Sequence, residues 1–121
     1  MLFRSIALTG GVPGAGVTVD LLHLYRTGAT PADLARLPDS LVGHIQICDG
    51  PAVAGDPAME GTTQRRIPGD GVFPVRAFAD AFAPSQHPLG LEVPLQDLRD
   101  QGIGALERAG RVVEGLRRVL A

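Results

Sequence analysis

The chain has 121 residues, enough for a single compact domain, and 45% of them are hydrophobic but only 4% aromatic, so we expect a core of aliphatic side chains. Eleven Lys and Arg residues against 13 Asp and Glu residues give a net charge of −2, which argues against a nucleic-acid partner. One cysteine excludes an internal disulfide and a multi-cysteine zinc site. The N-terminus carries no clear signal-peptide pattern and no apolar run of the ~18 residues that a membrane span needs, so we expect a soluble cytoplasmic protein with no membrane partner.

Strand-like and helix-like segments alternate along the chain. Strands are expected at residues 16–20, 42–49 and 89–94, where β-branched and aliphatic residues alternate with polar ones or glycine. Helices are expected from Pro31 to Pro38, after the cap residue Thr30, from Pro74 to Pro84, and at the end of the chain from Leu106 to Leu120. Residues 2–8 are expected to be the end of a helix. Residues 50–71 are expected to form one long loop. This alternation predicts an α/β fold with a parallel sheet.

The last helix carries apolar residues at steps of three and four. We expect this stripe to face the core, and it consists of Leu106, Ala109, Val113, Leu116 and Leu120.

Side chains alternate between the two faces of a strand, so each expected strand divides into a polar and an apolar set. The polar set is Thr18, Asp20, His44, Gln46, Cys48, Gly90 and Glu92, and the apolar set is Val17, Val19, Ile45, Ile47, Leu89, Leu91 and Val93. A parallel sheet covered by helices on both faces is apolar on both, whereas the inside of an α/β barrel holds polar groups at the carboxyl ends of its strands. The pattern therefore favours part of a barrel.

Asp20, Gln46 and Glu92 each lie near the end of a different expected strand. Two carboxylates and one amide oxygen suit Mg²⁺ or Mn²⁺ better than Zn²⁺. The alternative is that the two acids cap the turns that follow and that Gln46 is an ordinary polar residue. His23 could hold a substrate oxygen or be a plain loop residue.

The turn at residues 69–71, with Arg65 and Arg66 before it, also has two interpretations. It could hold a substrate oxyanion, or it could be a glycine turn beside two solvated arginines. Cys48 lies inside an expected strand, which favours a buried and unreactive thiol.

Four segments in order resemble the C-terminal part of the xylose isomerase-like TIM barrels, which include sugar-phosphate isomerases and epimerases and 3-dehydroshikimate dehydratases. The segments are GVTVDLLHLYRTG at 16–28, HIQICDGP at 44–51, RRIPGDG at 65–71 and GLEVP at 90–94. The resemblance implies a partial barrel over residues 1–121, with about three parallel βα units that correspond to strands six to eight.

The resemblance also implies a set of functional residues. Asp20, Gln46 and Glu92 match the ligands of a divalent metal, Mn²⁺ or Mg²⁺, while His23 and Arg65 match substrate-binding residues. Glu92 is the candidate catalytic acid or base, because the epimerases abstract a proton from a carbon next to a carbonyl. The expected substrate is a small sugar or sugar phosphate.

A complete barrel takes about 250 residues, so we expect a truncated or split isomerase or epimerase. It would be completed by a second copy or by a complementing N-terminal chain. A non-catalytic barrel remnant and a 3-dehydroshikimate dehydratase-like lyase are the alternatives.

Overall fold

The computed structural model describes residues 4, 7–8, 11–85 and 87–121. These residues form an open sheet of three parallel strands, β1 (Val17–Asp20), β2 (Val42–Ile47) and β3 (Leu89–Leu91), in that order. The predicted α/β fold and parallel sheet are confirmed. The helix expected over residues 2–8 lies mostly outside the described part of the chain.

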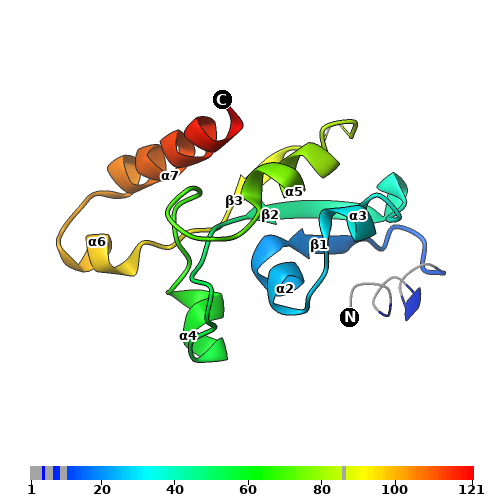
Figure 1. Ribbon diagram of the computed structural model, residues 1–121, viewed down its shortest axis with the longest axis horizontal. Helices are drawn as coiled ribbons and strands as arrows, with labels where there is room; N and C mark the ends of the chain where they lie inside the picture. The colour runs from blue at the N-terminus through cyan, green and yellow to red at the C-terminus, as the bar shows by residue number, and fades with distance from the viewer. Residues whose placement is uncertain (1–3, 5–6, 9–10, 86) are drawn as a thin grey trace.

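The helices follow the strands in the predicted alternation. They are α2 (Leu21–Arg26), α3 (Pro31–Leu34), α4 (Pro57–Thr62), α5 (Val75–Ala81), α6 (Gln96–Asp100) and α7 (Ala105–Leu120), with a 3₁₀ turn at Asp39–Leu41 before β2. Helices α3, α5 and α7 neighbour one another in this order (Figure 1). No helix among the described residues is long and apolar enough to cross a membrane.

The core lies on one face of the sheet, as the alternation of side chains predicts. Val19, Ile45 and Ile47 are almost fully buried there, together with Phe78 of α5. The residues of β3 are only half-buried, whereas Val17 and Val19 of the other edge strand, β1, are buried. On the other face Thr18 and His44 are exposed and Gln46 is half-buried, whereas Asp20 at the end of β1 is buried.

The start of α3 follows the predicted signal. The hydroxyl oxygen of Thr30 accepts a hydrogen bond from the backbone N–H of Asp33 at 3.4 Å, and the carboxylate of Asp33 accepts one from the backbone N–H of Thr30 at 2.8 Å. The hydrogen bonds that the backbone N–H and the hydroxyl of Thr30 donate to the Asp33 carboxylate lower the pKa of Asp33. The helix ends earlier than predicted, at Leu34 rather than near Pro38.

The inward face of α7 differs from the predicted stripe. Leu106 is 89% exposed and Val113 39% exposed, whereas Val112 and Gly115 are buried. The helix is turned about its axis relative to the prediction, so that Gly115 faces Ile67. A Cβ at position 115 would lie 2.2 Å from Cγ2 of Ile67, so only glycine allows the helix to come this close. The prediction was wrong for Leu106, Ala109 and Val113, which are exposed, while Leu116 does pack against the core.

Candidate functional site

The strand register brings the carboxyl ends of the three strands together. Asp20 pairs with Gln46 across β1 and β2, and Gln46 pairs with Gly90 across β2 and β3. The backbone N–H of Glu92 donates to the carbonyl of Ile47 at 3.1 Å, so Glu92 follows directly at the end of β3. All three predicted metal ligands therefore lie at one edge of the sheet.

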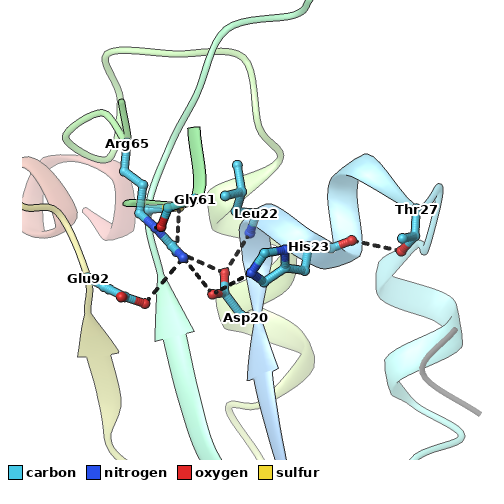
Figure 2. Close-up of polar contacts among 8 residues, drawn as sticks. Asp20, Leu22, His23, Thr27, Gly61, Arg65 and Glu92 are labelled. Atoms are coloured by element: carbon cyan, nitrogen blue, oxygen red, sulfur yellow. Dashed lines mark hydrogen bonds and ion pairs between the residues drawn. The ribbon is translucent and has the colours of Figure 1, made fainter. Parts of the chain in front are cut away.

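The guanidinium of Arg65 fills the space between the two acids, as Figure 2 shows. Its two terminal nitrogens donate to the two carboxylate oxygens of Asp20 at 3.0 and 2.9 Å. The nitrogen Nη2 also lies 3.3 Å from Oε2 of Glu92. One buried arginine thus holds the two predicted carboxylate ligands together.

Arg65 is fixed and permanently charged. Only 5% of the residue is exposed, and its Nε donates to the carbonyl of Gly61 at 3.1 Å. Burial alone would lower the pKa of Arg65, but the hydrogen bonds and charge of Asp20 outweigh burial, and the pKa is raised. The side chain is therefore a constant positive charge in the site.

Asp20 has a second role at the start of α2. Its Oδ1 accepts a hydrogen bond from the backbone N–H of Leu22 at 2.9 Å, which caps the helix. The cap alternative considered from the sequence is thus correct for Asp20, and the same carboxylate also faces the other charged groups of the site.

His23 and Gln46 lie at the margin of this cluster. Nε2 of His23 is 3.6 Å from Oδ2 of Asp20, and the imidazole is 68% exposed. The half-buried amide of Gln46 makes no hydrogen bond with the described residues. No three His, Cys, Asp or Glu side chains in the described ranges are grouped as a metal site.

A cleft of about 1010 Å³ opens beside Arg65. It lies between the segment around α4 and the start of α6, and it is lined by Arg65, Arg66 and Gln64 on one side and by Leu95, Gln96 and Leu98 on the other. Arg65 thus contacts the carboxylates with its guanidinium and is also one of the residues that line this cleft.

The loop that contains Arg65 is held in place by hydrogen bonds to Asp49, a residue that the sequence analysis did not single out. The buried carboxylate of Asp49 accepts hydrogen bonds from the backbone N–H groups of Gly50, Gly69 and Phe73 at 2.8 to 2.9 Å. Its backbone also pairs with Arg66, so β2 ends at Ile47 rather than at residue 49. The turn at residues 69–71 is consequently a structural turn around Asp49.

A second buried ion pair, between Arg26 of α2 and Glu60 of α4, holds α4 in place. This helix forms inside the segment that was expected to be a loop. Nε of Arg26 donates to both carboxylate oxygens of the buried Glu60 at 3.1 and 3.0 Å. The side chain of Asp56 caps the helix and Pro57 is its first residue, a start signal that the sequence did contain. Glu60 is therefore committed to Arg26 and is not a further ligand near Asp20.

Cys48 lies behind the ion pair and is fully buried. Burial raises the pKa of its thiol to about 11. The expectation of an unreactive buried cysteine agrees with this environment.

Comparison with known proteins identifies the fold. No protein-family model and no curated protein matches the sequence. Among solved structures, a xylose isomerase domain protein from Alicyclobacillus acidocaldarius subsp. acidocaldarius is 27% identical, with a TM-score of 0.67 over 98% of this chain. The chain is folded as part of a xylose isomerase-like TIM barrel.

A second solved structure agrees with this fold. A xylose isomerase-like TIM barrel/4-hydroxyphenylpyruvate dioxygenase fusion protein is 23% identical, with a TM-score of 0.66 over 75% of this chain. The chain spans 41% of the Alicyclobacillus structure and 15% of the fusion protein. The partial barrel expected from the sequence is confirmed.

Proposed function

We propose that this chain supplies part of the active site of a divalent-metal-dependent sugar or sugar-phosphate isomerase or epimerase. The observation that supports this proposal is the convergence of Asp20 and Glu92 on one positive group at the carboxyl ends of neighbouring strands. The carboxyl ends of the strands are where barrels of this fold carry their chemistry.

The donor set fits a hard cation. Asp20, Gln46 and Glu92 offer two carboxylates and one amide oxygen, the ligand types that Mg²⁺ and Mn²⁺ prefer. A single nitrogen of Arg65 reaches an oxygen of both acids, so these oxygens already surround one cationic centre. A bound metal would polarise a substrate carbonyl and so acidify the neighbouring C–H group.

Glu92 is the side chain best suited to move a proton. Its side chain is 41% exposed, and its ion pair with Arg65 runs through Oε2 at 3.3 Å. Asp20 is a poorer base, because both of its oxygens accept hydrogen bonds from Arg65 and one of them also caps α2. We assign proton abstraction to Glu92.

His23 and Arg65 are assigned to the substrate. The exposed imidazole of His23 lies beside the carboxylate of Asp20 and could hold a substrate hydroxyl or carbonyl oxygen. Arg65 borders the open cleft and carries the charge that would hold a hydroxyl oxygen or a developing oxyanion.

A non-catalytic barrel part is the second candidate. The observation in its favour is that Arg65 neutralises both acids from inside the chain. In that case the cluster would be a structural ion pair rather than a metal and proton-transfer site.

The two candidates differ in hydrogen exchange. The chain is incubated in D₂O with Mn²⁺ and a panel of ketoses and ketose phosphates, and deuterium uptake at the carbon next to the carbonyl is followed by NMR. We expect Mn²⁺-dependent uptake that is reduced at least about 100-fold in Glu92→Gln, the typical contribution of a general base.

Glu114→Gln is the matched control, since Glu114 lies exposed on α7. Uptake should be unchanged in this variant. Absence of metal-dependent uptake in the wild type would favour the non-catalytic candidate, whereas full uptake in a folded Glu92→Gln variant would overturn the assignment of proton abstraction to Glu92.

A further inference from the structure

Arg65 occupies the position toward which the predicted metal ligands converge. Its Nη2 lies 2.9 Å from Oδ2 of Asp20 and 3.3 Å from Oε2 of Glu92. Its Nη1 donates a hydrogen bond to the other oxygen of Asp20 at 3.0 Å, so both oxygens of that carboxylate already have a positively charged partner (Figure 2).

We infer that the guanidinium of Arg65 and a divalent cation compete for the carboxylates of Asp20 and Glu92, so that Arg65 closes the site until a cation displaces it. This inference rests on the proposed function, because it concerns the loading of the same site. It assigns Arg65 a role on the protein's own acids, in addition to any contact with substrate.

Two charged groups do not fit between the same oxygens. A divalent ion such as Mg²⁺ binds carboxylate oxygens at about 2.1 Å and takes their lone pairs, which Arg65 uses here for hydrogen bonds. Like charges a few ångströms apart in a buried site also repel strongly. Cation binding therefore requires the guanidinium to leave Asp20, and Arg65 in turn weakens cation binding.

Three features of Arg65 bear on this movement. Arg65 is one of the residues that line the cleft of about 1010 Å³, and its side chain is only 3% exposed. Its contact with the half-exposed Glu92 is the longer of its two ion pairs. Nε belongs to the same planar guanidinium group and donates to the carbonyl of Gly61, so a movement of the guanidinium away from Asp20 would also give up or shift this hydrogen bond.

The test compares Mn²⁺ affinity in the wild type, Arg65→Met and Arg66→Met, measured by calorimetric titration. Methionine keeps much of the length of arginine without its charge. Arg66 is the matched control, because it is the next residue, is exposed, and directs its side chain to the carbonyl of Asp70 rather than to the acids. We expect Arg65→Met to bind Mn²⁺ at least tenfold more tightly than the wild type, and Arg66→Met to match the wild type.

A second measurement needs no variant. Titration of the wild type with Mg²⁺ is followed by NMR of the arginine Nε–H groups. The Arg65 signal should move in step with Mg²⁺ binding, while the Arg66 signal stays in place. This measurement decides the matter if Arg65→Met does not fold.

The outcomes separate this inference from the proposed function. Equal Mn²⁺ affinity in the wild type and a folded Arg65→Met variant, or an unchanged Arg65 signal at saturating Mg²⁺, overturns the competition and leaves the proposed function standing. Tighter binding by Arg65→Met without any deuterium uptake by the wild type supports the competition and removes the proposed function. Absence of cation binding in both folded proteins overturns both.

Discussion

Arg65 donates one hydrogen bond to each carboxylate oxygen of Asp20, across 45 positions of the sequence and with both side chains largely buried. The pair joins the end of β1 to the loop that follows β2. A bidentate guanidinium–carboxylate contact is both strong and geometrically specific, so it orients the loop at the mouth of the site.

The substitution Asp20→Asn should destabilise the metal-free protein by about 3–5 kcal/mol, because it leaves the buried charge of Arg65 without its main partner. Asparagine is as good a helix cap as aspartate, so the effect reports the ion pair rather than the start of α2. The measurement is urea denaturation in the presence of EDTA.

The control is Asp80→Asn, which breaks the exposed pair between Asp80 and Arg76. We expect a change of less than about 1 kcal/mol there. Similar small losses in both variants would show that the buried pair contributes no more than an exposed one.

Replacement of Gly71 by alanine should destabilise the protein, while the same change at Gly110 should stabilise it. A Cβ at position 71 would lie 2.2 Å from Oδ1 of Asp49 and 2.3 Å from the carbonyl oxygen of Gly50, so we expect a loss of about 1–3 kcal/mol. Gly110 lies inside α7 with open space around its Cβ position, and alanine should gain up to about 1 kcal/mol of helix propensity. Thermal unfolding of both variants gives the comparison, and shifts of the same sign would contradict it.

Stability should fall as the pH rises from about 9 to about 11 because of Cys48. The pKa of its thiol is about 11 in the folded protein against 9.0 for an exposed thiol, so the folded state keeps a proton that the unfolded state loses in this range. The contribution is present in full below pH 9 and is lost as the pH rises through 11, and it amounts to about 3 kcal/mol. Unfolding free energies of the wild type and Cys48→Ala across this range provide the measurement, and parallel pH curves would show that the thiol makes no such contribution.

The strands and their polar face could be predicted from the sequence, because a period of two residues is a local signal. Val19 and Ile45 are buried and Thr18 and His44 exposed as the alternation requires. The same local pattern placed Asp20, Gln46 and Glu92 at strand ends, where the register brings them next to one another.

The contacts of Arg65 could not be predicted, since they depend on the path of a long loop. That path is set by Asp49, whose carboxylate accepts hydrogen bonds from the backbone N–H groups of residues up to 24 positions away. Helix α2 was not predicted, although Asp20 was considered as a cap of the turn that follows β1. The buried face of α7 was predicted wrongly because the prediction used only the spacing of apolar residues. It did not consider that Gly115 allows a close approach to Ile67.

That approach links two distant parts of the chain. At Gly115 the last helix touches Ile67 and the carbonyl of Pro68, two and three residues beyond Arg65. Helix α7 therefore packs against the segment that follows Arg65 and limits where this segment can lie. A side chain at position 115 would have to displace the segment at Ile67 and Pro68 and, with it, the loop that places Arg65 beside the acids.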